Sequence, residues 1–292
     1  MKECLTSLHT HTAFCDGKDD VETMCRAAFE KGLSAIGFSA HAPIDKTGID
    51  STWHMKSERL ESYLEAINSA RRRWEGRIAV YAGLEADYIK GLRSAADNDL
   101  QNLGLDYIIG SVHYLAPGCG TRSEGSVPFT VDGPAAEVEK GVMECFSGDG
   151  EAMMHAYWGA VAEMIDLGGF DIIGHLDLIK KSRSWFNIGS GIYLKHAEKI
   201  AAAIAASGLV VEVNTGGLNR GYFPETCPSV EILRLLRQRN VPVMISADAH
   251  CAADLDGNYD AARRALRDAG YASHVIFGGR INGKPAWRDI EV

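Results

Sequence analysis

The chain has 292 residues, of which 46% are hydrophobic and 24% are charged, and its apolar runs are too short to cross a bilayer, so we expect a globular protein and exclude a transmembrane one. A formal net charge of −9 argues against broad nucleic-acid binding, which requires a basic surface. The seven cysteines include no CxxC pair and the N-terminus shows no secretory signal, so we expect a cytoplasmic location.

Short apolar runs alternate with helical patterns along most of the chain. Runs rich in Val, Ile or aromatic residues predict buried strands at Leu5–His11, Ala35–His41, Ile78–Glu85, Tyr107–His113, Phe170–His175, Leu209–Val213 and Val241–Ser246. Helical spacing with suitable start and stop residues predicts helices at about 19–32, 57–76, 151–167, 191–206, 228–239 and 258–269. This alternation implies an α/β fold with a parallel sheet, and seven such units favour a closed or nearly closed barrel over an open doubly wound sheet.

The domain organisation is simple. Composition does not change along the chain, so we expect a single domain over residues 1–292. Segment 116–150 is polar and rich in Gly and Pro, which predicts a long loop or lid over one end of the barrel.

Most of the predicted strands end in residues that can bind a metal ion. In chain order, these residues are His9, His11, Asp16, His41, Glu85, His113, His175, Asp248 and His250. The strand ends of a parallel barrel meet on one face, so we expect these groups to converge at the carboxyl ends of the strands. Imidazole and carboxylate ligands suit Zn, Fe or Mn, and nine of them suit two or three divalent ions.

The alternative for each histidine is a hydrogen-bonded structural role, which is the more common use of a single buried imidazole. Six of the ten histidines lie at strand ends together with three acidic residues, and this repetition favours metal binding. We expect the other four, His54, His155, His196 and His274, to be structural, although His54 could face a substrate.

The ligand order resembles that of the polymerase-and-histidinol-phosphatase (PHP) family. The resemblance covers about residues 5–251 and is closest to the monofunctional histidinol-phosphatase branch in the motifs SLHTHTAFCDG, GFSAHAP, GLEADY, GSVHYL, IIGHLDLIKK, VEVNTGGLNRG and SADAH. It implies a distorted (β/α)7 barrel, similar to a TIM barrel, that holds three ions. The implied ligands are His9, His11, Glu85 and Asp248 for the first ion, Glu85, His113 and His175 for the second, and Asp16, His41 and His250 for the third. The branch often has Asp before the histidine of its second motif, where this chain has Ala40, which is not a ligand position.

Two arginines indicate the kind of substrate. Arg183 follows the fifth predicted strand and Arg220 follows the sixth, on the side of the expected metal ligands. A guanidinium matches phosphate oxygens, and the resemblance implies that both residues bind a substrate phosphate. The alternative for each is a solvated loop charge.

These observations together predict a metal-dependent hydrolase of phosphate monoesters. The ions would activate water for direct attack on phosphorus, and the two arginines would neutralise phosphoryl charge. Asp248, His250 or a metal-bound water could protonate the leaving group. The resemblance alone implies the substrate, L-histidinol phosphate, which would give L-histidinol and phosphate in histidine biosynthesis.

Three other functions remain open at this point. The same scaffold could hydrolyse a different small monoester, a nucleotide or an oligonucleotide end. The barrel could be a non-catalytic binding module, or it could be a metal-dependent amide or C–N hydrolase. The sequence identifies neither the native metal nor the oligomeric state, and it gives no sign of a membrane partner.

Overall fold

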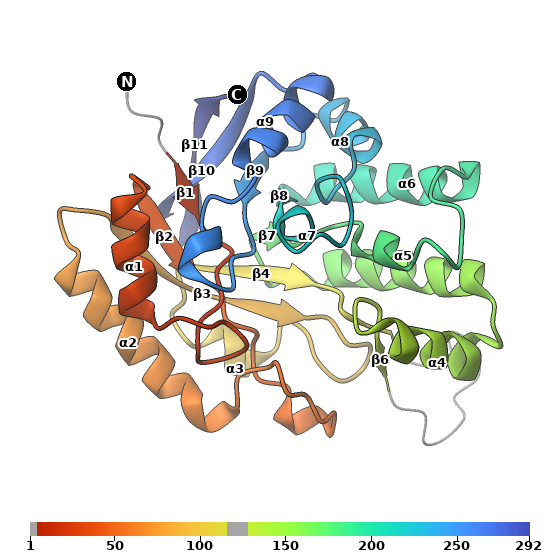
Figure 1. Ribbon diagram of the computed structural model, residues 1–292, viewed down its shortest axis with the longest axis horizontal. Helices are drawn as coiled ribbons and strands as arrows, with labels where there is room; N and C mark the ends of the chain where they lie inside the picture. The colour runs from red at the N-terminus through yellow and green to blue at the C-terminus, as the bar shows by residue number, and fades with distance from the viewer. Residues whose placement is uncertain (1–4, 116–127) are drawn as a thin grey trace.

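Seven parallel strands form a nearly closed barrel in the computed structural model, which describes residues 5–115 and 128–292 (Figure 1). In order around the barrel, these strands are β1 (Thr6–Ser7), β2 (Ala35–Phe38), β3 (Ala79–Asp87), β4 (Tyr107–Ser111), β7 (Ile172–Ile173), β8 (Val210–Asn214) and β9 (Val243–Ser246). A parallel bridge between Thr10 and Ala249 joins the chain after β1 to the chain after β9 and so brings the two edges together. The expected distorted (β/α)7 barrel is therefore confirmed, and the open sheet is excluded.

Helices lie between the strands and cover the outside of the barrel (Figure 1). Six of the described helices fall where the sequence predicts them: α1 (Val21–Glu30), α2 (Leu60–Arg73), α5 (Gly150–Leu167), α6 (Gly191–Ser207), α8 (Val230–Arg237) and α9 (Tyr259–Asp268). Shorter turns occupy the connections: η1 (Asp45–Thr47), η2 (Ser57–Arg59), α3 (Asn98–Gln101), η3 (Leu178–Ser182), α7 (Gly216–Asn219) and η4 (Ala252–Asp254). Among the described residues, no helix combines the length and the apolar character that crossing a bilayer requires.

The segment predicted as a loop at 116–150 contains a helix. Residues 116–127 of this prediction lie outside the described residues. Strand β6 (Phe129–Thr130) pairs with β5 (Tyr114–Leu115), and helix α4 (Ala135–Phe146) follows. The prediction of a loop was wrong for α4, because Val138 and Val142 lie four residues apart and form a buried helical face despite the Gly- and Pro-rich flanks.

An antiparallel hairpin after the last barrel unit closes the amino end of the barrel. It consists of β10 (Ser273–Ile281) and β11 (Lys284–Glu291) and was not part of the prediction. Its Val275 and Phe277 pack in one apolar cluster with residues that fill the barrel interior, namely Leu8, Tyr107, Ile109, Ile172, Val210 and Met244. The opposite, carboxyl end therefore carries the polar groups described below.

The ring of Tyr107 fills this interior and constrains Gly83 on the neighbouring strand. A Cβ atom at Gly83 would lie 2.6 Å from Cζ of Tyr107, well inside van der Waals contact. Overpacking of this kind costs about 1–3 kcal/mol, so we expect Gly83→Ala to lower the free energy of unfolding by about that amount in denaturant titrations of metal-free protein.

The matched control for this substitution is Gly159→Ala on helix α5. The added Cβ at Gly159 would meet nothing within 4 Å, and alanine is favoured over glycine in a helix by about 1 kcal/mol. We expect this variant to be as stable as the parent or more so. Equal stability of Gly83→Ala and the parent would show that the interior can rearrange around Tyr107.

Candidate metal centre

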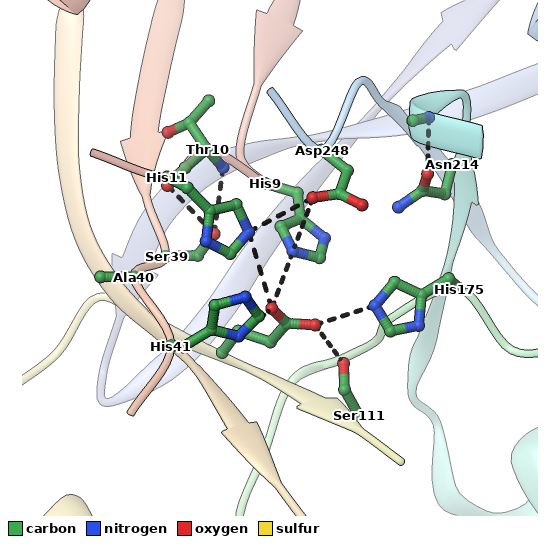
Figure 2. Close-up of polar contacts among 12 residues, drawn as sticks. His9, Thr10, His11, Ser39, Ala40, His41, Ser111, His175, Asn214 and Asp248 are labelled. Atoms are coloured by element: carbon green, nitrogen blue, oxygen red, sulfur yellow. Dashed lines mark hydrogen bonds and ion pairs between the residues drawn. The ribbon is translucent and has the colours of Figure 1, made fainter. Parts of the chain in front are cut away.

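The structure brings all nine predicted ligands together at the carboxyl ends of the barrel strands. The imidazoles of His9, His11, His41 and His175 and the carboxylate of Asp248 point toward one another (Figure 2). Ligand atoms lie within 4.8 Å of one another in overlapping groups: His11, Asp16, His41 and His250; His9, His11 and Glu85; His9, His175 and Asp248; and His41, Glu85 and His113. Groups from six strand ends thus share one small volume.

Glu85, from β3, lies between two sets of imidazoles. Its Oε2 is 2.9 Å from Nδ1 of His41 and 3.2 Å from Nε2 of His9, whereas its Oε1 is 2.9 Å from Nε2 of His175. Burial acts to raise the pKa of Glu85, but the charges of His9, His41 and His113 outweigh it and hold this pKa well below its usual value. The ionised carboxylate therefore presents one oxygen to each set of imidazoles.

Several ligand atoms of this cluster lack a hydrogen-bond partner although they are buried. Among the described residues they include Nε2 of His9, Nε2 of His11, Nδ1 of His41 and Oε2 of Glu85. Buried polar atoms nearly always have a hydrogen-bond partner, so nitrogens without one that face a carboxylate oxygen without one indicate that a cation completes the site. Burial, together with the charges of His250 and His41, lowers the pKa of His11 to about 3, which keeps this imidazole neutral, as a ligand must be.

Glu212, on β8, holds the ring of His9 from behind and was missed by the sequence analysis. Nδ1 of His9 donates to Oε1 of Glu212 at 2.9 Å, which leaves Nε2 of His9 directed at the cluster. The amide of Asn214 donates to the same oxygen at 2.6 Å, and the backbone N–H of His175 donates to Oε2 at 3.2 Å. Carboxylates that orient ligating histidines in this way raise metal affinity.

Asp16 and His250 form the outer part of the cluster. Nε2 of His250 lies 3.2 Å from Oδ2 of Asp16, and Oδ1 of Asp16 lies 3.5 Å from Nδ1 of His11 and 3.8 Å from Nε2 of His41. The side chains of Asp16 and His250 are 28% and 24% exposed, in contrast to the buried Glu85. A cation held by this group would therefore be the one nearest to solvent.

Arg220 contacts the ligand cluster through Asp248 and also lines the cavity described below. Its guanidinium donates to Oδ2 of Asp248 at 2.8 Å and to the carbonyl oxygen of Asp248 at 3.0 Å. Asp248 itself has a φ of 49°, a left-handed conformation that Asp tolerates better than most residues and that often marks functional sites. The remaining N–H groups of Arg220 are able to bind an anion beside the cluster.

Arg183 follows β7 and η3, as the sequence predicts, and its role in binding phosphate stays a prediction. Its side chain is exposed and is not among those that line the cavity, whereas Lys181 lines it. The orientation of Lys181 follows from η3. A 3₁₀ helix repeats every three residues, so Lys181 points to the same side as the cavity residue Leu178. The structure therefore offers Lys181 as a further cation that lines the cavity together with Arg220.

Lys181 and Arg220 share the ring of Tyr222. Nζ of Lys181 lies 4.1 Å from the centroid of this ring, and Cζ of Arg220 lies 5.6 Å from it. Burial lowers the pKa of Lys181, and the nearby charge of Arg220 lowers it further, although Asp132 opposes this shift. The side chains of Lys181 and Arg220 line the same cavity, and two cations there favour the binding of an anion.

A cavity of about 840 Å³ opens over the metal cluster. Its floor includes Glu85, His113 and Asp248, and one wall is formed by residues of β6 and α4, among them Phe129 and Gly141. Such a volume is large enough for a small organic phosphate.

The residues that the sequence analysis missed carry recognisable signals. Glu212 interrupts an otherwise apolar strand, and Asp87 lies two residues after Glu85 and so on the same side of β3. A charged residue in a buried strand needs a partner, and here that partner is a ligating histidine in each case.

Comparisons with known proteins identify the family. The profile of the PHP domain matches residues 7–216. A protein named "Probable histidinol-phosphatase" from Deinococcus radiodurans is 30% identical over 267 residues, which covers 91% of this chain and 94% of the relative. The histidinol-phosphatase of Bacillus subtilis is 27% identical over 266 residues, which covers 87% and 96%.

Solved structures share the fold. A crystal structure from Listeria monocytogenes, assigned provisionally as a histidinol phosphatase, has a TM-score of 0.78 at 24% identity and covers 88% of this chain and 99% of its own. The histidinol phosphate phosphatase of Lactococcus lactis, solved with zinc, L-histidinol and phosphate, has a TM-score of 0.70 at 18% identity and covers 92% and 95%. With the family profile matched over most of its length, the chain belongs to the PHP domain family.

Proposed function

We propose that this protein is a metal-dependent histidinol-phosphatase, which hydrolyses L-histidinol phosphate to L-histidinol and phosphate. The observation that carries the proposal is the placement of a cationic pair, Arg220 and Lys181, beside a cluster of His and carboxylate ligands in one cavity. The names of the relatives from Deinococcus radiodurans and Bacillus subtilis support this substrate.

The donor set fits divalent transition-metal ions, and we propose two or three of them, with zinc, manganese and iron as the candidates. The proposed ligands are the nine converging residues, namely His9, His11, Asp16, His41, Glu85, His113, His175, Asp248 and His250. Bound ions would lower the pKa of water and neutralise charge on the phosphoryl group.

The residues of the chain contribute binding and orientation. Arg220 and Lys181 bind the phosphoryl oxygens, and Asp248 holds the guanidinium of Arg220 in place through two hydrogen bonds. Asp248 and His250 line the cavity and are the proposed groups near the leaving oxygen. The proposed lid role of segment 116–150 is supported by the cavity wall that β6 and α4 provide.

The test of this function is phosphate release from L-histidinol phosphate by protein that has been stripped with a chelator and reloaded with Mn²⁺, Zn²⁺ or Fe²⁺. We expect turnover that depends on added metal and exceeds that on other small monoesters. A rival PHP activity would appear as preferential cleavage of a nucleotide, a phosphodiester or an oligonucleotide end with L-histidinol phosphate ignored. That result would overturn the proposed substrate but not the metal centre.

Replacement of Lys181 and of Arg183 distinguishes the two candidates for the second phosphate-binding cation. We expect Lys181→Ala to lower kcat/KM by about 10- to 100-fold, since a charge-assisted hydrogen bond contributes about 1.5–3 kcal/mol. We expect Arg183→Ala to change kcat/KM by no more than about twofold, as for an exposed surface substitution. Steady-state kinetics of both variants decide the assignment. If Arg183→Ala had the larger effect, Arg183 would be the second phosphate-binding cation.

A further inference from the structure

A chain of buried hydrogen bonds runs from the loop between β2 and α2 to the ligand His113. Oγ of Ser51 lies 2.7 Å from Nδ1 of His54, and Nε2 of His54 lies 2.7 Å from Oδ2 of Asp87. The other oxygen of Asp87, Oδ1, lies 2.9 Å from Nδ1 of His113. The members of this chain are all buried, and Ser51 also lines the cavity.

The donors and acceptors in this chain fix which nitrogen of each ring carries hydrogen. A carboxylate only accepts, so Nδ1 of His113 and Nε2 of His54 both donate to Asp87. Nδ1 of His54 is then left to accept from the hydroxyl of Ser51. As a result, Nε2 of His113 is the ring nitrogen left to bind a metal ion, and it lies 3.2 Å from Nε2 of His175 and 3.6 Å from Oε1 of Glu85.

Aromatic packing fixes the ring of His54 in this orientation. The indole of Trp53 lies 3.9 Å away, centroid to centroid, and stacks at 5.5 Å on the ring of Tyr114 with an interplanar angle of 5°. His54 is therefore held by contacts on its face and by hydrogen bonds at both nitrogens, which is more restraint than a loop histidine needs for packing alone.

Oδ2 of Asp87 depends on His54 for its hydrogen bond. Oδ1 accepts from the ring and from the backbone N–H of His113, at 2.9 and 3.2 Å, whereas Oδ2 accepts from His54. A buried carboxylate oxygen that loses its donor is costly, so removal of His54 would favour rotation of Asp87 and release of the ring of His113.

From this geometry we propose that His54 is a positioning residue, which acts through Asp87 to hold His113 in the orientation that binds a metal ion. His54 thereby contributes to metal affinity without being a ligand itself. Partners of this kind change metal affinity by roughly 10- to 100-fold when they are removed. The inference concerns metal binding and holds for any monoester that the cavity accepts.

The test measures metal affinity directly, without substrate. In competition with a chromogenic chelator, we expect His54→Leu to weaken Zn²⁺ binding by roughly 10- to 100-fold. We expect His54→Gln to restore most of the affinity, because its amide N–H can still donate to Asp87. The control is His155→Leu on α5, a histidine outside the cluster, which should bind Zn²⁺ as the parent does.

A double-mutant cycle tests whether His54 acts through Asp87. If it does, adding His54→Leu to Asp87→Asn causes little further loss, so the two effects are strongly non-additive. The visible spectrum of Co²⁺-loaded protein should also change in His54→Leu and recover in His54→Gln, which a purely structural role would not cause.

Three outcomes would overturn the proposal. They are an unchanged affinity in His54→Leu, additive losses in the double variant, and the loss of one bound ion that His54→Gln does not restore. The last would make His54 a ligand, since His41, His54 and Asp87 also lie close enough to hold an ion. Loss of phosphatase activity on L-histidinol phosphate with normal metal affinity would count against the proposed function only.

Discussion

Glu85→Gln should reduce kcat/KM by more than about 100-fold. Changing a residue that only orients a metal ligand costs about 10- to 100-fold, and we expect a larger loss for Glu85, a ligand itself. Both oxygens of Glu85 face imidazoles, with Oε2 near His9 and His41 and Oε1 near His175. A neutral amide cannot bridge two cations through both of its termini, because its nitrogen has no lone pair to give.

The measurement combines steady-state kinetics with metal analysis of dialysed protein. We expect Glu85→Gln to retain fewer ions than the parent. The control is Glu198→Gln, which removes an exposed ion pair with Arg239 on the far side of α6 and should leave both values unchanged. Full activity of Glu85→Gln with a full set of ions would refute the bridging role.

The second large effect is expected for Arg220→Ala, with kcat/KM reduced by about 10²- to 10³-fold, as for other groups that stabilise developing charge. The substitution removes the proposed phosphate contact and also leaves Oδ2 of Asp248 without the guanidinium donor at 2.8 Å.

Arg220→Lys separates charge from geometry at this position. It keeps a cation but cannot contact Asp248 at two points and phosphate at the same time, so we expect intermediate activity. Inhibition by inorganic phosphate is an independent test of the contact between Arg220 and phosphate. The inhibition constant should rise most in Arg220→Ala. An unchanged inhibition constant would place the phosphate elsewhere in the cavity.

The barrel and the ligand cluster could be predicted from the sequence because both depend on local patterns. Apolar runs such as Tyr107–His113 and Phe170–His175 mark parallel strands, and the rule that their carboxyl ends meet on one face then brings His113 and His175 together. No long-range information is needed for this step.

The residues behind the ligands were harder to find, because their roles depend on register and loop geometry. In the sequence, Glu212 is one residue of an apolar strand. Only the position of β8 in the barrel shows that its side chain faces His9. Lys181 and Arg183 are equally plausible in sequence, and only the 3₁₀ turn distinguishes them. His54 belongs to a loop whose path the sequence does not specify.

The missed elements share a different cause. Helix α4 lies between polar segments rich in Gly and Pro, and its short apolar face, Val138 and Val142, was outweighed by these flanks. The hairpin of β10 and β11 is antiparallel and follows the repeating units, so the alternation of strand and helix says nothing about it.

The hairpin of β10 and β11 also determines at which end the protein can be attached to a surface. Because Val275 and Phe277 seal one end of the barrel, a molecule bound over the metal ligands can exchange with solvent only from the opposite side. Strand β11 lies at this sealed end, and its Lys284 is exposed. Anchoring the protein to a bead or an electrode through Lys284 would thus leave the reactive face turned to the solution.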